Sequence, residues 1–110
     1  MKKSEINFLV ELDHENVPER MLWQATDSDA EAPQETKAIS IALWDQQNLN
    51  SLRIDLWTKD MPVDEMKRFF IDCLGGMAQT VLSATGDEYM SNELNTLCEK
   101  LVEHIKAESN

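Results

Sequence analysis

The stretch SLRIDLWTKDMPVDEMKRFF, residues 51–70, contains the point at which a strand pattern gives way to a helix pattern. Before Pro62, the apolar residues Leu52, Ile54 and Leu56 recur at every second position, as in a strand with one buried face. After Pro62, apolar residues recur at the spacing of one helical stripe, at Val63, Met66, Phe69, Phe70, Cys73, Leu74 and Met77. We therefore expect sheet before the proline and helix after it.

Three further strands are expected upstream, at residues 6–12, 19–26 and 37–44. The turn-forming segments DHENVP, residues 13–18, and DQQNLN, residues 45–50, connect the strands into two antiparallel hairpins. In each hairpin one register brings the apolar residues to a common face. These registers place position 10 opposite 23, 8 opposite 25 and 12 opposite 21, and then 43 opposite 52, 41 opposite 54 and 39 opposite 56.

The segment between the hairpins, Asp27 to Thr36, reads DSDAEAPQET. It is acidic, contains Pro33 and has no hydrophobic periodicity. We expect a solvated, mobile loop and no domain boundary.

Two helices are expected in the C-terminal half. Asp60 and the acidic first turn favour a helix start after Pro62, and Gly86 is placed as its C-terminal cap. Gly75 and Gly76 inside this helix indicate a close approach by another helix or subunit, or a bend. The second amphipathic helix covers about residues 88–107.

The predicted fold class is therefore α+β, with a four-stranded antiparallel sheet of two hairpins followed by two antiparallel helices packed on one face. The 110 residues are expected to form a single domain.

The composition excludes several classes of partner. With 21 acidic and 10 basic residues, the net charge is -11, which disfavours nucleic acid and anionic membrane surfaces. Neither a signal peptide nor an apolar run long enough to cross a bilayer is recognised. We expect a cytoplasmic protein without direct membrane insertion.

No motif for catalysis or metal binding is found. Cys73 and Cys98 lie on apolar helix stripes, which favours a role in the core, and His14 and His104 have no partner at ligand spacing. The acidic residues at the start of the first helix could suggest acid/base chemistry, but helix capping explains them better. We expect neither an enzyme nor a cofactor.

One face of the predicted sheet is more apolar than a solvated face requires. Trp44 and Trp57 lie opposite the inward apolar set, and tryptophan is costly to leave in water. Two explanations stay open: loops or strand twist cover these side chains, or the face binds a partner protein or a second copy. On the second explanation we expect a homodimer that buries Trp44 or Trp57. The candidate binding residues are Leu9, Leu22, Trp44, Arg53, Asp55, Trp57 and Lys59.

Three segments carry a resemblance to a known family: MKKSEI at residues 1–6, VELDHENVPERMLWQATD at 10–27 and, above all, LRIDLWTKDMPVDEMKRFF at 52–70. Together they resemble GldC, the family of gliding motility-associated proteins of Bacteroidetes. The resemblance spans nearly the whole chain and is loosest in the acidic loop and after Gly86. It implies a small, non-enzymatic cytoplasmic accessory protein whose partners belong to the motility and type IX secretion machinery. It implies no catalytic residues.

A weaker analogy rests on topology alone. Four antiparallel strands followed by two helices, in a small acidic protein, are similar to the export chaperone SecB. On this alternative, the face with Trp44 and Trp57, or a groove beside the helix, would bind extended unfolded segments.

Overall fold

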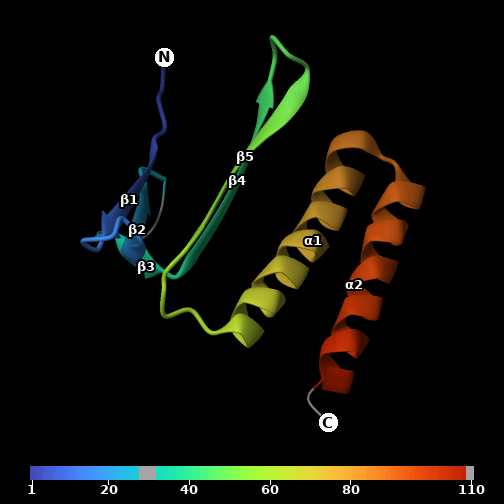
Figure 1. Cartoon of the computed structure of the whole chain (residues 1–110). Coiled ribbons are helices and arrows are strands. Elements are labelled where there is room, and N and C mark those ends of the chain that lie inside the picture. Colours follow the sequence, from blue (N-terminus) through green and yellow to red (C-terminus); the bar gives the residue numbers. More distant parts are fainter. Residues whose placement is uncertain (28–31, 109–110) are drawn as a thin grey trace. The chain divides into compact units, whose positions relative to one another are not determined.

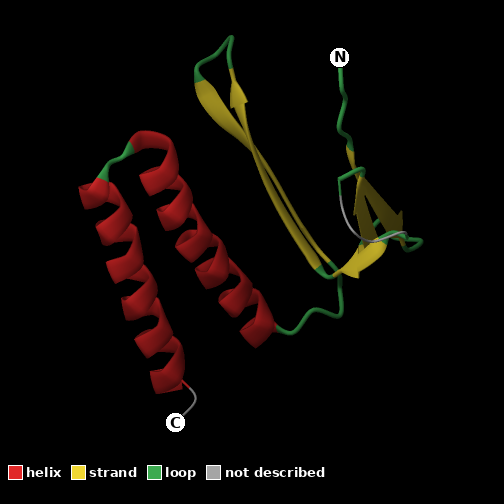
Figure 2. Ribbon diagram, turned by 180° about the vertical axis from the view of Figure 1, so that it is seen from behind, coloured by secondary structure: helices red, strands yellow, loops and turns green. Residues whose placement is uncertain are grey.

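The computed structural model describes residues 1–27 and 32–108. These residues form an α+β fold in which strands precede two helices, as predicted (Figures 1 and 2). The chain divides into two compact units, Met1–Pro62 and Val63–Asn110, each described by itself. The elements are β1 (Ile6–Leu12), β2 (Pro18–Ala25), β3 (Gln34–Thr36), β4 (Ala38–Asp45), β5 (Asn50–Trp57), α1 (Val63–Thr85) and α2 (Glu88–Glu108).

The strands of the first unit form two antiparallel sheets. One has the order β1-β2-β3, and the other is the hairpin β4-β5 (Figure 1). The prediction of two hairpins is confirmed, but the strands do not join into a single four-stranded sheet. Leu9 and Leu22 therefore lie in a different sheet from Trp44 and Trp57.

The predicted register of the first hairpin is wrong by two residues. Val10 pairs with Met21 and Phe8 pairs with Trp23, and a bulge shifts the register between Glu11 and Leu12. A slip of two residues leaves every side chain on its original face, so the apolar pattern could not distinguish the two registers. The tight turn after β1 decides between them, since the backbone N–H of Asp13 donates to the carbonyl of Val17 at 2.9 Å.

The prediction of a continuous loop over residues 27–36 is wrong at its C-terminal end. Strand β3 pairs Gln34, Glu35 and Thr36 with the central strand β2. Three polar residues are too few for hydrophobic periodicity, and backbone pairing alone defines this strand. Residues 28–31 of the predicted loop lie outside the described residues.

The predicted register of the second hairpin is confirmed. Strands β4 and β5 pair Leu43 with Leu52, and Ile41 with Ile54. The connecting turn is closed by Asp45, whose carbonyl accepts the backbone N–H of Leu49 at 2.8 Å. The strand pairing and the connecting turn are therefore consistent with a single register.

Burial differs from strand to strand within each sheet: Met21 on β2 and Ile39 on β4 are buried, whereas most of β1 and β5 is exposed. Met21 on β2 is 0% exposed, whereas Leu52 and Ile54 on β5, which the sequence placed in the core, are 52% and 47% exposed. Among the described residues, the buried apolar side chains are Met21, Ile39 and Ala78.

The two predicted helices are confirmed, and their contacts show that they are antiparallel. The Ser91 hydroxyl donates to the carbonyl of Ala78 at 2.8 Å, near the connection between the helices. Farther along, the ammonium group of Lys67 donates to the carboxylate of Glu108 at 2.8 Å. Gly86 ends α1 with φ of 73° and donates its N–H to the carbonyl of Leu82, as expected for a C-terminal cap.

The structure tests two details of the helix prediction. A Cβ added at Gly75 or Gly76 would meet no atom within 4 Å in the described part of the chain, so the second helix does not approach closely there, and a second subunit or a bend at these glycines stays a prediction. The carboxylate of Asp60 does not cap α1; it accepts hydrogen bonds from Thr58 and Lys37. Sequence reasoning missed these partners because neither lies on a helical stripe.

Candidate functional site

The outer face of the β4-β5 hairpin carries four of the predicted binding residues. Side chains alternate between the faces of a strand, so the observed register places Trp57 beside Ala38 and Trp44 beside Ser51 on one face. Trp44 is 62% exposed and Trp57 is 49% exposed, at opposite ends of the hairpin. We define the outer face by residues Ala38, Ser40, Ala42, Trp44, Ser51, Arg53, Asp55 and Trp57.

Between the tryptophans, three polar side chains bind one another. The Arg53 guanidinium donates to both carboxylate oxygens of Asp55, from Nη2 at 3.1 Å and from Nε at 3.2 Å. The Ser40 hydroxyl donates to Asp55 at 2.7 Å and accepts from Arg53 Nη2 at 2.7 Å. These bonds, the one from Arg53 first, hold the pKa of Asp55 below its ordinary value. The charges at the centre of the outer face are therefore mutually satisfied.

This arrangement can be covered by another protein without leaving a lone buried charge. An unpaired charge is expensive to desolvate, whereas a bidentate pair keeps its hydrogen bonds when water is removed. Exposed tryptophans at the two ends supply apolar contact area. The outer face thus combines exposed apolar area with a paired charged centre.

The end of β5 adjoins a hollow of about 200 Å³. Its lining brings together Asp55, Trp57 and Lys59, which were predicted as binding residues, with residues from the turn between β1 and β2. The complete lining is Val17, Pro18, Asp55, Leu56, Trp57 and Lys59.

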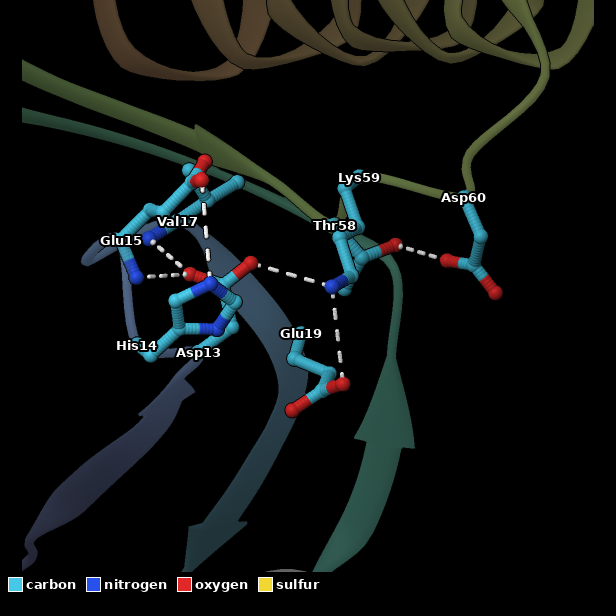
Figure 3. Close-up of polar contacts among 8 residues, drawn as sticks. All are labelled: Asp13, His14, Glu15, Val17, Glu19, Thr58, Lys59 and Asp60. Carbon is cyan, nitrogen blue, oxygen red and sulfur yellow. Dashed lines mark hydrogen bonds and ion pairs between the residues drawn. The ribbon is translucent and has the colours of Figure 1, made fainter.

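Lys59 forms part of a polar link between β5 and the β1-β2 turn (Figure 3). Its ammonium group lies 3.0 Å from Asp13 and 3.6 Å from Glu19, and its backbone N–H donates to the carbonyl of Pro18 at 3.0 Å. The hydrogen bond to Asp13 is the main cause of a raised pKa for Lys59. The structure therefore gives Lys59 a role within the first unit, and its contact with a partner stays a prediction.

Asp13 organises the turn to which Lys59 binds. One carboxylate oxygen accepts the backbone N–H groups of Glu15, at 2.8 Å, and Val17, at 3.1 Å, while the other accepts from Lys59 (Figure 3). The bond from Val17 is the largest cause of the lowered pKa of Asp13. The turn composition predicted a reversal of the chain, but no pattern indicated its partner 46 residues away.

Thr58 completes this region beside Lys59. It is 2% exposed; its N–H donates to the carbonyl of Lys37 at 2.9 Å, and its hydroxyl donates to Asp60 at 2.7 Å. The Lys37 ammonium lies 2.9 Å from the other oxygen of Asp60, and these partners lower the pKa of Asp60. Sequence reasoning missed Thr58 because a buried polar residue gives no hydrophobic signal.

The remaining candidates, Leu9 and Leu22, pair directly across the first sheet. Leu9 is 54% exposed, and Leu22 is half-buried. Both line a hollow of about 290 Å³ together with Asn7, Phe8, Trp23, Gln24 and Pro33.

The histidines and cysteines are distributed over separate places. His14 lies 3.7 Å from the exposed Glu15, His104 lies 2.7 Å from Glu108, and Cys73 and Cys98 are not joined in a disulfide. Within residues 1–27 and 32–108, no three His, Cys, Asp or Glu side chains are grouped as a metal site. No helix in the same ranges has the length and apolar character needed to cross a membrane.

Comparison with protein families shows to which family the chain belongs. The model of the family described as "Gliding motility-associated protein GldC-like" matches residues 18–107. The chain belongs to the GldC-like family. The resemblance seen in the sequence is thereby confirmed, and the family connects the chain with gliding motility. No curated protein and no solved structure matches the chain.

The match to the GldC-like family includes the whole outer face but not the whole first unit. Residues 18–107 contain β4, β5, α1 and all of α2 except its last residue, whereas β1 and Asp13 lie before the matched range. The outer face is thus part of the region that the family model describes. None of the comparisons supports the analogy with export chaperones.

Proposed function

We propose that this chain is a non-enzymatic accessory protein of the gliding motility apparatus that acts in the cytoplasm by binding another protein of that apparatus or of the associated type IX secretion machinery. Membership of the GldC-like family supports the cellular process. The outer face of the β4-β5 hairpin supports the mode of action, because it offers exposed aromatic side chains around a satisfied polar centre.

The observation that carries the proposal is the exposure of Trp44 and Trp57 on a single face. Tryptophan is enriched among the few residues that supply most of the binding energy at protein interfaces. The rim of such an interface is polar, and Lys59 near Trp57 provides polar contacts at one end. The partner is expected to present apolar pockets for the tryptophans.

The charge of the chain indicates the charge of its partner. With a net charge of -11, the protein attracts a basic surface and repels an acidic one. We therefore expect a partner with a positive net charge, and faster association at low ionic strength.

Photo-crosslinking in gliding cells tests the proposal. A crosslinking amino acid at Trp57 or Arg53, followed by mass spectrometry, is expected to capture a component of the motility or secretion machinery. The same amino acid at Glu99, on α2 and outside the outer face, serves as the matched control. Capture of no such component from the outer face, together with normal gliding after deletion of the protein, would overturn the proposal.

A further inference from the structure

The β4-β5 hairpin is a sheet of two strands in the described part of the chain. A two-stranded hairpin is marginally stable in water, and each outer edge presents backbone N–H and C=O groups that can pair with another strand. Strand β5 has eight residues, and the apolar side chains of Leu52 and Ile54 are about half exposed. The outer edge of β5 can therefore accept a further strand.

The charge of the hairpin permits a second copy of this acidic chain to approach. Residues 38–57 contain Asp45, Arg53 and Asp55 as their charged residues, a net charge of -1, whereas the whole chain carries -11. Like-charge repulsion between two copies is therefore weaker here than the net charge of the whole chain suggests.

The sequence of β5 is complementary to itself in the antiparallel direction. Residues 52–56 read Leu-Arg-Ile-Asp-Leu, so a rotation about Ile54 exchanges the two leucines and places Arg53 opposite Asp55. Two copies paired with Ile54 opposite Ile54 gain two pairs of opposite charge on one face. On the other face, each Leu52 meets the Leu56 of the second copy.

Neighbouring registers lack this complementarity. A shift of two residues in one direction places Arg53 opposite Arg53, and a shift in the other direction places Asp55 opposite Asp55. Like charges directly opposite each other are destabilising, and a shift by one residue puts the apolar side chains on the wrong face. The charges thus select the register centred on Ile54. Strand β4 has no such selection, because its charged residue is the terminal Asp45.

We propose that two copies of this chain pair through the outer edges of β5, antiparallel and centred on Ile54, to form a four-stranded sheet. The resulting interface is two-fold symmetric, because each copy contributes the same strand to the other. The inference goes beyond the proposed motility partner and does not depend on it, since the pure protein suffices to test it.

Charge reversal tests the register by analytical ultracentrifugation. Arg53→Asp or Asp55→Arg alone turns both opposite-charge pairs into like-charge pairs, which is expected to raise the dimer dissociation constant about thirty-fold. An equimolar mixture of the two variants restores opposite charges only between chains and is expected to regain most of the dimer. The double variant R53D/D55R, which also restores the pair within the chain, is expected to dimerise like the natural protein. Circular dichroism checks that each variant is folded.

Disulfide formation locates the two-fold axis. With Cys73 and Cys98 replaced by serine, Ile54→Cys is expected to crosslink two copies on mild oxidation, because residue 54 faces itself. Leu52→Cys is the matched control: it lies on the same face with similar exposure, but its counterpart in the second copy is four residues along the strand. Crosslinking at Leu52 in preference to Ile54, a natural protein that is monomeric at about 100 µM, or a mixture of charge variants that stays monomeric would overturn the proposal.

A further variant separates this inference from the proposed function. Trp44→Ala, on the neighbouring strand β4, is expected to abolish capture of the motility partner while the dimer persists. Loss of the dimer in this variant would contradict pairing through β5.

Discussion

The two hairpins of the first unit are built from strands of similar length, yet only one of them is completed by its own chain. In the first, β2 is flanked by β1 and β3, and its Met21 is fully buried. In the second, β4 and β5 pair only with each other among the described strands, and their tryptophans are 62% and 49% exposed. Burial does not follow from strand pairing alone, since Ile39 on β4 is 7% exposed and Phe8 on β1 is 44% exposed. Apolar alternation therefore predicts a strand, whereas tertiary contacts decide which of its side chains are buried.

The largest expected effect on this contrast comes from Met21→Ala. Removing a fully buried methionine side chain is expected to lower the free energy of unfolding by about 2–5 kcal/mol. The control is Leu43→Ala on β4, where the side chain is 54% exposed and a loss of about 1 kcal/mol is expected. Urea unfolding of both variants measures the difference. Equal losses would contradict the view that the side chain of Met21 is packed in the core and that of Leu43 is not.

A smaller effect is expected from Thr58→Val at the junction between the two hairpins. Valine keeps the shape of the buried threonine but cannot donate to Asp60, so the free energy of unfolding is expected to fall by about 1 kcal/mol. Thr58→Ser keeps the hydroxyl and serves as the control, since it loses only a methyl group. If Thr58→Ser lowers the free energy of unfolding as much as Thr58→Val does, then packing rather than the hydrogen bond is the important contribution.

The ionisation of Asp13 and Lys59 sets the pH range in which their ion pair stabilises the fold. The folded-state pKa of Asp13 lies below the ordinary 3.8, so its stabilising contribution is present above pH 3.8 and is lost as the pH falls through the folded value. The pKa of Lys59 is raised above 10.5, so its contribution is lost only as the pH rises beyond that value. The link is therefore intact between these limits.

Asp13→Asn breaks the ion pair with Lys59. It is expected to lower the free energy of unfolding at neutral pH and to make that free energy less dependent on pH in acid. Asp45→Asn is the matched control, because the pKa of Asp45 is also lowered, chiefly by the side chain of Asn48, but no lysine of the described residues binds its carboxylate. Its effect is expected to be smaller and insensitive to salt. Urea midpoints from pH 3 to 7, at low and high salt, measure both. Equal salt dependence in the two variants would show that the ion pair does not stabilise the turn.

The smallest effect on stability is expected from Trp44→Ala. This side chain is 62% exposed, and its removal is expected to change the free energy of unfolding by about 0.5 kcal/mol or less. Partner capture in cells is expected to fall strongly, since exposed tryptophans provide the contact area. If Trp44→Ala changes neither the free energy of unfolding nor the capture of the partner, then Trp44 is not part of the binding surface.

The fold was predictable where local patterns have a single solution. The register of β4 and β5 followed from alternation and the turn at Asp45, and it correctly placed Trp44 and Trp57 on one face. The register of the first hairpin was not predictable in this way, because a slip of two residues preserves both faces. Strand β3 has too few residues for any periodic signal.

The candidate site was also predictable only where the pattern along a strand decides the position of a side chain. Parity along β5 was enough to group Arg53 and Asp55 with the tryptophans. It could not reveal that Lys59 binds Asp13, since contacts between residues distant in sequence depend on tertiary structure rather than on local pattern. Ser40, which joins the pair of Arg53 and Asp55, was placed on the face but not recognised as their partner.

The link between Lys59 and Asp13 also sets an order for folding during synthesis. Both hairpins close over short turns and can form as soon as their strands leave the ribosome, whereas the link joins residues 46 positions apart. Until Lys59 has been made, the first hairpin lacks the contact that holds the turn at Asp13 against the end of β5. We therefore expect the native alignment of β1 and β2 to become secure only after the second hairpin has been synthesised, so that the later hairpin completes the folding of the earlier one.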